Sequence, residues 1–314
     1  MNVVLHYRAS AGFFAILEAA RPKDIVLTIV DEADDGAFAN AMLKADVLLH
    51  VLRPVTASDI GHAPQLKLIQ KIGVGVNTID LDAARAHGVA VCNMPGTNSR
   101  AVAEMTLMLM LATLRRVMVF DPLTRRGDGW RPDPLELDQV GEIGGRTVGF
   151  VGFGAVPNIL APALGALGAT SLYTARTQRD DDPARFVSLD ELLTKSDIVS
   201  LHVPSTPETR GMIGERAIAR MKKGAILINT ARGDLVDEAA LVSALKSGHL
   251  AAAGLDVFAR EPAARDNPLF QQENVVLAPH IAWLTPETLR RSVTVAMENC
   301  RRLRIGETLL HRVI

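Results

Sequence analysis

The sequence has little of what marks secreted or nucleic-acid-binding proteins. Its 314 residues include only two cysteines, too few for a disulfide framework, and this favours a reducing compartment. Basic residues are not in excess, because 34 Lys and Arg balance 35 Asp and Glu, so nucleic acid is not expected as a partner. The N-terminus lacks the basic and then apolar pattern of a signal peptide, and we expect a cytoplasmic protein. The 48% of hydrophobic residues and 22% of charged residues are typical of a globular chain of about two domains.

Charge is absent from one long stretch, between Thr147 and Ala175. A membrane-spanning helix needs about 20 apolar residues, so the length of this stretch alone would allow one. The stretch nevertheless contains five glycines and two prolines, which are typical of turns and element ends. We therefore predict a buried strand, a turn, a helix and a second strand here, and no membrane partner.

Short apolar runs alternate with helical patterns along almost the whole chain. Strands that are apolar on both faces and separated by helices are typical of parallel α/β sheets. There are two such series, so the sequence predicts two α/β domains. The predicted strands are 3–6, 25–30, 47–51, 66–72 and 89–92 in the first series, and 147–151, 171–174, 198–203, 225–230, 251–256 and 275–278 in the second.

Several helices are indicated by their ends or by their composition. Ser188, Asp237 and Thr285 stand where helix N-caps are expected, each before a helical pattern. The segment Arg100–Arg115 is apolar almost all round, so its helix must be buried on most sides, either by a second subunit or inside one core. The polar segment Phe120–Arg146 that follows is predicted to be an arm or a loop.

A dinucleotide-binding turn is indicated after the strand 147–151. The chain reads GFGAVP from Gly152 to Pro157 and continues as an apolar helix. Gly152 permits a tight turn, and Gly154 lets the backbone approach a pyrophosphate at the helix N-terminus. Pro157 stands where a dinucleotide fingerprint has Gly or Ala, and we expect the turn to survive because proline suits the first turn of a helix. A plain glycine turn is the alternative.

The end of the next strand bears on which cofactor is bound. An NAD site commonly has Asp or Glu there, for the ribose 2′-hydroxyl group. The chain has Arg176 and Thr177 instead, and no carboxylate before Asp180. Because Arg176 and Thr177 are suited to a 2′-phosphate, we predict NADP(H) in preference to NAD(H). The alternative is that Arg176 is a solvated loop residue.

Three polar side chains come shortly after the last three predicted strands. They are Arg232, Glu261 and His280. In open α/β sheets, ligands bind at the carboxyl ends of the strands. Each of the three has an ordinary structural explanation when taken alone, but together with the glycine turn they predict a catalytic site.

The motifs, in this order and spacing, resemble those of the D-isomer-specific 2-hydroxyacid dehydrogenases over nearly the whole chain. Departures from the family pattern are Pro157 in the glycine turn and Asn77 where Asp is frequent. The resemblance is carried by residues 71–80 (KIGVGVNTID), 93–96 (NMPG), 102–104 (VAE), 152–157 (GFGAVP), 202–204 (HVP), 229–233 (NTARG), 253–258 (AGLDVF), 261–262 (EP) and 279–283 (PHIAW).

The resemblance implies an α/β fold of two Rossmann- or flavodoxin-like parallel-sheet domains with the active site in a cleft between them. A discontinuous substrate-binding (catalytic) domain would comprise 1–94 and 287–314, and a dinucleotide-binding Rossmann domain would comprise 95–286. The resemblance also implies a homodimer formed largely through the cofactor domains, which fits the apolar helix 100–115 and the arm around Trp130.

The activity that the resemblance implies is reduction of a 2-keto acid to the D-2-hydroxy acid by hydride from a nicotinamide cofactor. Arg232 has a planar fork suited to a carboxylate and an adjacent carbonyl oxygen, and His280 would donate the proton. Glu261 beside His280 would favour the charged imidazole. The cofactor-binding residues would be Thr106, Gly152, Gly154, Ala155, Val156, Arg176, Thr177, Val203, Pro204, Thr230, Ala231, Asp256 and Ala282.

The substrate carboxylate is expected against the backbone N–H groups of Val74, Gly75 and Val76, where glycine permits close approach. Arg53 is a candidate for holding a substrate tail, with a surface ion pair as the alternative. Trp283 is a candidate for lining the substrate pocket, with packing between domains as the alternative.

The sequence ends at Ile314, without the regulatory domain of many phosphoglycerate dehydrogenases. Together with Arg176, this favours a glyoxylate/hydroxypyruvate reductase that acts on a small 2-keto or 2-hydroxy acid. The alternatives are an NAD-dependent dehydrogenase of a bulkier or phosphorylated D-2-hydroxy acid and a nucleotide-sensing co-repressor. A metal site is not expected, because the eight histidines show no ligand-like clustering.

Overall fold

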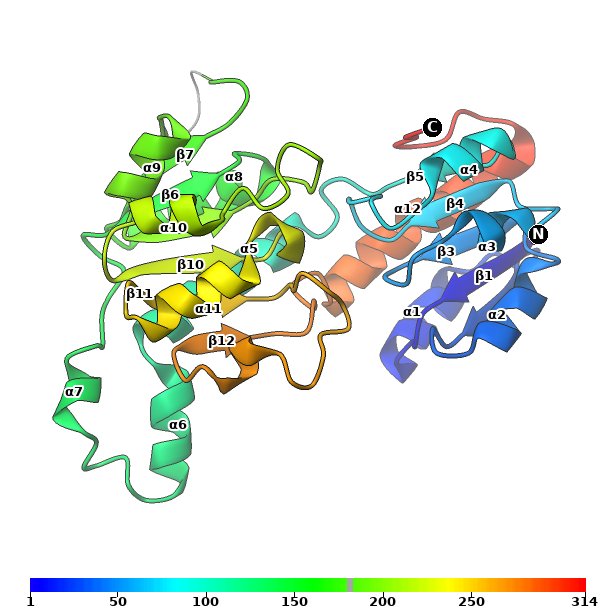
Figure 1. Ribbon diagram of the computed structural model, residues 1–314. Helices are drawn as coiled ribbons and strands as arrows, with labels where there is room; N and C mark the ends of the chain where they lie inside the picture. The colour runs from blue at the N-terminus through cyan, green and yellow to red at the C-terminus, as the bar shows by residue number, and fades with distance from the viewer. Residues whose placement is uncertain (180–182) are drawn as a thin grey trace. The chain divides into compact units, whose positions relative to one another are not determined.

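The computed structural model describes residues 1–179 and 183–314, which divide into two compact units (Figure 1). The first unit comprises Met1–Asn98 and Trp283–Ile314, and the second comprises Ser99–Ala282. From the sequence, these boundaries are expected after residue 94 and before residue 287. Each unit contains one sheet in which the paired strands are parallel, so the predicted α/β fold class is confirmed.

The sheet of the first unit has the order β2-β1-β3-β4-β5. The chain runs from β1 outward to β2 and then returns to β3 on the other side of β1. The junction of β1 and β3 is therefore a topological switch point, where ligands of open α/β sheets commonly bind. The strands are β1 (Asn2–His6), β2 (Val26–Val30), β3 (Val47–His50), β4 (Leu68–Lys71) and β5 (Ala90–Cys92).

Helices cover both faces of this sheet, as the apolar strands require. Alternate residues of β1 point to opposite faces, so Leu5 joins one hydrophobic core and Val4 joins the other. The core around Leu5 contains side chains of α1 and α12, whereas the core around Val4 contains side chains of α2, α3 and α4. These helices are α1 (Ala11–Ala20), α2 (Asp35–Met42), α3 (Ala57–Gly61), α4 (Leu81–Ala86) and α12 (Pro286–Ile305).

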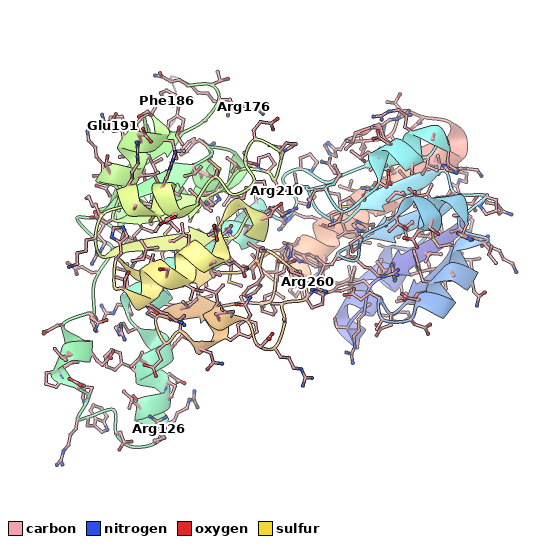
Figure 2. The ribbon with its side chains drawn as sticks, viewed as in Figure 1. Arg126, Arg176, Phe186, Glu191, Arg210 and Arg260 are labelled. Carbon is pink, nitrogen blue, oxygen red and sulfur yellow. The ribbon has the colours of Figure 1, made fainter. Side chains whose placement is uncertain are left out.

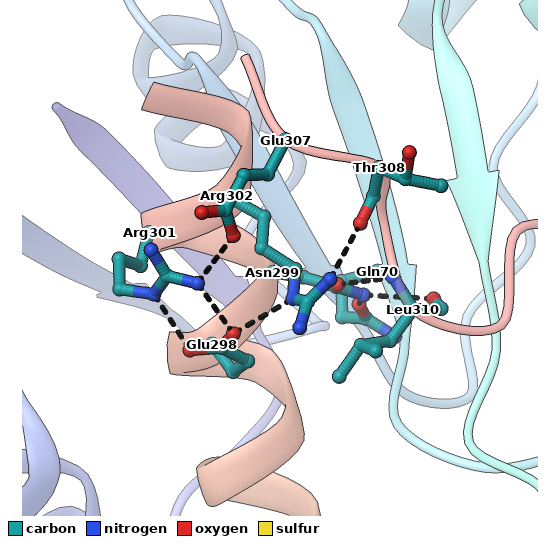
Figure 3. A network of polar contacts seen from close by, with 8 residues as sticks. All are labelled: Gln70, Glu298, Asn299, Arg301, Arg302, Glu307, Thr308 and Leu310. Carbon is teal, nitrogen blue, oxygen red and sulfur yellow. Dashed lines mark hydrogen bonds and ion pairs between the residues drawn. The ribbon is translucent and has the colours of Figure 1, made fainter. Parts of the chain in front are cut away.

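A buried polar network ties α12 to the sheet (Figure 3). The Asn299 side chain donates to Gln70 Oε1 at 2.6 Å and to the backbone carbonyl of Leu310 at 3.1 Å. Both amide side chains are fully buried, and Gln70 also reaches backbone carbonyls at the end of β5. On the exposed side of α12, Glu298 pairs with Arg301 at 2.8 Å. The network therefore fixes the last helix and the segment after it against β4 and β5.

The sheet of the second unit has the order β12-β11-β10-β9-β6-β7-β8. The chain runs from β6 outward through β7 and β8 and returns to β9 on the other side of β6, so β6 and β9 flank its switch point. Its strands are β6 (Thr147–Val151), β7 (Thr170–Thr174), β8 (Arg185–Phe186), β9 (Ile198–Leu201), β10 (Ala225–Asn229), β11 (Leu250–Leu255) and β12 (Val275–Leu277).

Two layers of helices bury the faces of this sheet. Side chains of α5 and α8 contribute to the hydrophobic core on one face, and those of α9, α10 and α11 contribute to the core on the other face. The helices are α5 (Ser99–Leu114), α8 (Ala155–Ala166), α9 (Leu189–Lys195), α10 (Glu215–Arg220) and α11 (Glu238–Lys246), with 3-10 turns at Gly233–Leu235 and Pro268–Gln271.

The predicted arm contains two helices that the sequence analysis treats as loop. These are α6 (Val117–Arg125) and α7 (Pro134–Leu137). The apolar side chains of α6, such as Val117 and Met118, are exposed in this chain, and Pro122 stands inside the helix, so the segment does not indicate a helix from its sequence. The prediction of a loop was wrong for this physical reason. By contrast, α5 packs against α8 and three strands of its own unit, which supplies much of the burial that its apolar sequence requires.

The predicted N-caps are confirmed. Ser188 accepts from Glu191 N, Asp237 from Ala240 N and Thr285 from Thr288 N. Several strands end one or two residues earlier than predicted, because the chain leaves the sheet as soon as it reaches the loops that carry the polar residues. Over residues 1–179 and 183–314, no helix is both long enough and apolar enough to cross a membrane.

Candidate active site

The glycine turn lies at the switch point of the second sheet, between β6 and β9. Gly152 has a φ of 92°, which L-residues with side chains rarely adopt. A Cβ on Gly152 would also lie 2.7 Å from the carbonyl oxygen of His202, which directly follows β9. Only glycine therefore allows β6 to turn this closely against the end of β9.

The second glycine of the turn begins α8. Gly154 is the N-cap residue, no side chain caps this helix end, and a Cβ at this position would meet no atom within 4 Å. The first backbone N–H groups of α8, at Ala155 and Val156, are thus available to an anion in a space that the protein leaves open. Pro157 lies buried in the first turn of α8, as expected. These features fit the pyrophosphate of a dinucleotide.

The loop after β7 carries the residues that bear on cofactor choice. Arg176 and Thr177 are both exposed, and Arg176 is labelled on this loop in Figure 2. The hydroxyl group of Tyr173 on β7 accepts from the backbone N–H of Arg179 at 3.1 Å, and this bond holds the loop against the strand. Asp180, the first carboxylate after the strand, lies outside the described residues.

The other predicted cofactor residues come from neighbouring elements of the same unit. Val203 and Pro204 follow β9, while Thr230 and Ala231 follow β10. Thr106 lies on α5, and its hydroxyl group is 2.9 Å from the hydroxyl group of Thr230. The structure thus brings Thr106 to the end of β10, although the two threonines are far apart in the sequence.

Arg232 stands on a loop that is built by its neighbours. The Asn229 side chain donates to the carbonyl of Arg232 at 2.8 Å and accepts from the N–H of Ala231 at 3.0 Å. The next residue, Gly233, packs so closely that a Cβ would overlap the backbone of Phe258, which follows β11. The loops after β10 and β11 are therefore held in direct contact, and Arg232 is positioned relative to the Glu261 loop.

Glu261 and His280 form a close pair. Nδ1 of His280 is 2.6 Å from Glu261 Oε2, and the second carboxylate oxygen accepts from the N–H of Phe258 at 3.0 Å. Both side chains are largely buried, with 22% of His280 and 33% of Glu261 exposed. Because Nδ1 faces the carboxylate, Nε2 is the ring atom through which a proton can be exchanged with a ligand.

Burial and neighbouring charged groups shift the pKa values of Glu261 and Arg232. Burial alone would raise the pKa of Glu261, but the hydrogen bond and charge of His280, the Phe258 N–H and the charge of Arg232 together hold this pKa below its ordinary value. Burial lowers the pKa of Arg232, while Glu261 and Asp234 oppose that shift. A guanidinium nevertheless stays protonated in proteins. The site therefore combines a fixed cation with an imidazole–carboxylate pair.

The backbone at His280 has an unusual conformation, which is supported by hydrogen bonds to Asp256. His280 has a φ of 56°, in the left-handed region that non-glycine residues seldom occupy. The two oxygens of the fully buried Asp256 accept from the N–H groups of Ile281 and Ala282, at 2.8 and 2.9 Å. Burial raises the pKa of Asp256 although these two bonds oppose the shift. Asp256, predicted to bind the cofactor, is therefore also the support of the His280 turn.

The predicted substrate loop lies in the first unit, after β4. The Asn93 side chain donates to the carbonyl of Val74 at 2.9 Å, and the N–H of Met94 donates to the carbonyl of Gly73 at 2.8 Å. The Val74 side chain is exposed, and Gly75 and Val76 are partly exposed. The turn after β5 therefore holds this loop while its residues stay accessible.

Arg53 and Trp283 have different surroundings in the first unit. Arg53 Nη2 is 2.7 Å from Asp35 Oδ1, and the guanidinium lies over the Phe38 ring. Trp283 is 7% exposed and packs in the hydrophobic core, edge-on to Tyr7 at 6.0 Å between ring centroids. This location favours a packing role for Trp283.

Three supporting residues escaped the sequence analysis. Asn229 holds the Arg232 loop, Asn93 holds the substrate loop, and Asp234 accepts from Ser205 in the loop after β9. Only Asn229 has a local signal, because an Asn side chain at the end of a strand can bond to the backbone two or three residues further on. Among residues 1–179 and 183–314, no group of three or more His, Cys, Asp or Glu side chains could hold a metal ion.

Comparison with known proteins finds a matching family model and similar sequences. The family model described as "D-isomer specific 2-hydroxyacid dehydrogenase, NAD binding domain" matches residues 107–282. The chain is 39% identical over 296 residues to a D-3-phosphoglycerate dehydrogenase of Mycobacterium leprae, which covers 92% of this chain and 55% of that protein. It is 41% identical over 265 residues to a glyoxylate reductase of Aeropyrum pernix, which covers 82% and 79% of the two chains. The chain thus spans about half the length of the phosphoglycerate dehydrogenases that it resembles.

Solved structures agree with this placement. A protein of Thermus thermophilus superposes with a TM-score of 0.90 at 35% identity, covering 100% of both chains. A glyoxylate reductase from Paecilomyes thermophila superposes with a TM-score of 0.83 at 29% identity, covering 100% of this chain and 98% of the other.

Proposed function

Because the chain belongs to the D-isomer-specific 2-hydroxyacid dehydrogenase family, whose members depend on NAD(P), we propose that it reduces a small 2-keto acid of the glyoxylate/hydroxypyruvate type to the D-2-hydroxy acid with NADPH. One observation carries the proposal. The Glu261–His280 pair and Arg232 follow three successive strands of the sheet whose switch point carries the glycine turn.

The chemistry of the side chains supports this reaction. When bound, the nicotinamide supplies the hydride that reduces the keto carbon. The fork of Arg232 binds the substrate carboxylate and the adjacent carbonyl oxygen, which polarises the carbonyl. Nε2 of His280 donates the proton that turns this oxygen into a hydroxyl group, and the carboxylate of Glu261 stabilises the protonated imidazole beforehand.

The preference for NADPH over NADH is part of the proposal. It is supported by the exposed Arg176 and Thr177 on the loop after β7, where a ribose 2′-phosphate would meet a cation and a hydroxyl group. The pyrophosphate would lie on Gly152, Gly154 and the first N–H groups of α8, because no side chain caps this helix end. The nicotinamide end would be bounded by Thr106, Val203, Pro204, Thr230, Ala231, Asp256 and Ala282.

We assign different roles to the two units. Residues 95–286 would bind the dinucleotide, and residues 1–94 with 287–314 would bind the substrate. The N–H groups of Val74, Gly75 and Val76 would receive the substrate carboxylate, because this loop is anchored yet accessible. Arg53 would hold a polar tail of the substrate.

A homodimer is the assembly that we propose, in the cytoplasm. Exposed apolar side chains gather along α5, α6 and the arm, and a second copy of the chain would bury them. The most exposed is Trp130, at 88%. The apolar side chains concerned are Met108, Val117, Met118, Trp130, Leu135 and Leu137.

Coenzyme oxidation tests the proposal directly. The oxidation of NADPH and of NADH is followed with glyoxylate, hydroxypyruvate, pyruvate and phosphohydroxypyruvate. We expect the highest kcat/KM with NADPH and glyoxylate or hydroxypyruvate. Oxidation of neither coenzyme by any of the four acids would refute the assignment.

A second candidate is dehydrogenation of a phosphorylated D-2-hydroxy acid with NAD. It is favoured by the identity of 39% to a D-3-phosphoglycerate dehydrogenase and by the cationic Arg53 in the first unit. A preference for NADH and phosphohydroxypyruvate in the same assay would select this candidate.

A further inference from the structure

Arg53 is held by its surroundings at the switch point of the first sheet, where β3 ends beside β1. The Nε2 atom of His50 is 2.7 Å from the carbonyl oxygen of Arg53. Because a carbonyl oxygen only accepts, Nε2 of His50 is the donor, and this bond fixes the backbone of Arg53 against the end of β3. The other side of the residue, its guanidinium, lies 5.4 Å from the centroid of the Phe38 ring.

The Phe38 ring is in turn held by His6, the last residue of β1. The two rings are stacked, with centroids 3.8 Å apart and planes 8° apart. His6 is 1% exposed and Phe38 is 2% exposed, so the stack lies inside the unit, and the Arg53 guanidinium lies over its Phe38 ring. The Phe38 ring on α2 therefore lies against two groups. These are the imidazole of His6 at the end of β1 and the guanidinium of Arg53 in the loop after β3.

The His6 side chain makes no hydrogen bond that would explain its presence. Within residues 1–179 and 183–314, neither ring nitrogen of this buried imidazole has a hydrogen-bond partner, a costly arrangement for polar atoms. Burial, and then the charge of Arg53, lowers the pKa of His6 to about 4, so the ring is neutral near neutral pH. A neutral flat ring can stack on Phe38 without adding a second cation beside Arg53.

The two terminal nitrogens of the Arg53 guanidinium have different surroundings. Its Nη2 faces Asp35 at 2.7 Å, whereas Nη1 is buried and has no hydrogen-bond partner among the described residues. An arginine whose backbone, ring contact and one nitrogen are all fixed holds the accessible part of its side chain, which is 29% exposed, in a defined direction.

We propose that the flat ring of His6, acting through Phe38, positions Arg53 for the polar tail of the substrate, and so determines preference for tailed over tailless 2-keto acids. The inference rests on the proposed function, because it takes Arg53 to bind that tail. Hydroxypyruvate and phosphohydroxypyruvate carry such a tail, and glyoxylate does not.

The test compares kcat and KM for hydroxypyruvate and glyoxylate in three forms of the full chain. His6→Ala removes the stack, whereas His6→Phe keeps a flat ring and removes only the nitrogens. We expect His6→Ala to lower the ratio of kcat/KM for hydroxypyruvate to that for glyoxylate by about tenfold, through KM for hydroxypyruvate. His6→Phe should keep the ratio within about twofold, as should the control His87→Ala at an exposed histidine of the same unit.

A double-mutant cycle shows whether His6 acts through Arg53. Arg53→Ala should lower the same ratio, and adding His6→Ala to it should cause little further loss. If the two substitutions lower the ratio independently, so that their effects multiply, the proposal is overturned. The same holds if His6→Phe lowers the ratio as much as His6→Ala does. If His6→Ala does not fold, His6→Leu, which fills the volume without a flat ring, replaces it.

The outcomes separate this inference from the proposed function. If the unmodified protein reduces none of the acids, the proposed function fails. If it reduces both substrates and His6→Ala changes both equally or neither, the proposed function stands and the positioning role of His6 is wrong.

Discussion

Replacement of Glu261 by glutamine tests how the His280 proton is held. The carboxylate oxygen lies 2.6 Å from Nδ1 of His280, within a pair whose side chains are only 22% and 33% exposed. Glutamine can still accept from Nδ1 through its amide oxygen, so the ring keeps its orientation and loses only the anionic partner. The experiment therefore isolates charge from geometry.

The expected magnitude follows from the kind of bond that is replaced. A hydrogen bond to a charged group contributes roughly 1.5–3 kcal/mol and one between neutral groups roughly 1 kcal/mol, so about 0.5–2 kcal/mol is lost. Because the hydrogen bond and charge of His280 lower the pKa of Glu261, the same attraction favours the protonated imidazole and is lost in Glu261→Gln. Reduction needs the protonated ring, so its rate declines as the pH is raised. In Glu261→Gln this decline should begin at a lower pH than in the unmodified protein. Oxidation needs the neutral ring, so the variant should oxidise the hydroxy acid at lower pH than the unmodified protein does.

The assay is the pH dependence of kcat/KM in both directions, with purified Glu261→Gln and unmodified protein. Glu273→Gln, at an exposed glutamate of the same unit, is the matched control and should keep the original profile. At a pH well below the transition, the variant and the unmodified protein should reduce substrate at similar rates. An unchanged profile in Glu261→Gln would show that the carboxylate does not hold the proton on His280.

Three further predictions concern the second unit. Arg232→Lys should lower kcat/KM by about 100-fold, because loss of the bidentate fork removes roughly 2–3 kcal/mol of binding in the transition state; near-normal turnover would contradict the role of Arg232. Arg176→Ala should raise KM for NADPH by about tenfold and leave KM for NADH nearly unchanged, and equal changes for both coenzymes would argue against a 2′-phosphate contact. Gly152→Ala should lower the free energy of unfolding by roughly 1–3 kcal/mol in a urea titration, since the Cβ would be 2.7 Å from a carbonyl oxygen, whereas Gly154→Ala, in open space, should not.

The sequence predicted the fold well because its main signals are local. Strands buried on both faces are apolar along their whole length, so their positions are visible without knowledge of their neighbours. The glycine turn is equally local, because the strand before it and the helix after it are adjacent in the chain. The order of strands within each sheet, by contrast, was not predicted, because it depends on how segments far apart in the chain pair in space.

The candidate site was predictable only in part. Arg232, Glu261 and His280 were selected because each follows a strand, and the structure pairs Glu261 with His280. The support of the His280 turn was not predictable, because Asp256 bonds to backbone N–H groups that lie 25 and 26 residues further along the chain. The stack of His6 on Phe38 depends in the same way on how β1 and α2 meet in space. Neither contact leaves a periodic or local trace in the sequence.

The discontinuity of the first unit has a consequence for biosynthesis. Residues 1–98 leave the ribosome early, but the helix that covers one face of their sheet, α12, begins only at Pro286. Until then the apolar side chains that meet α12, such as Leu5 and Leu17, lack part of their cover. The second unit, which is continuous from Ser99 to Ala282, can complete its own core first. The apolar face of the first unit that α12 covers therefore stays partly exposed until the second unit has been synthesised.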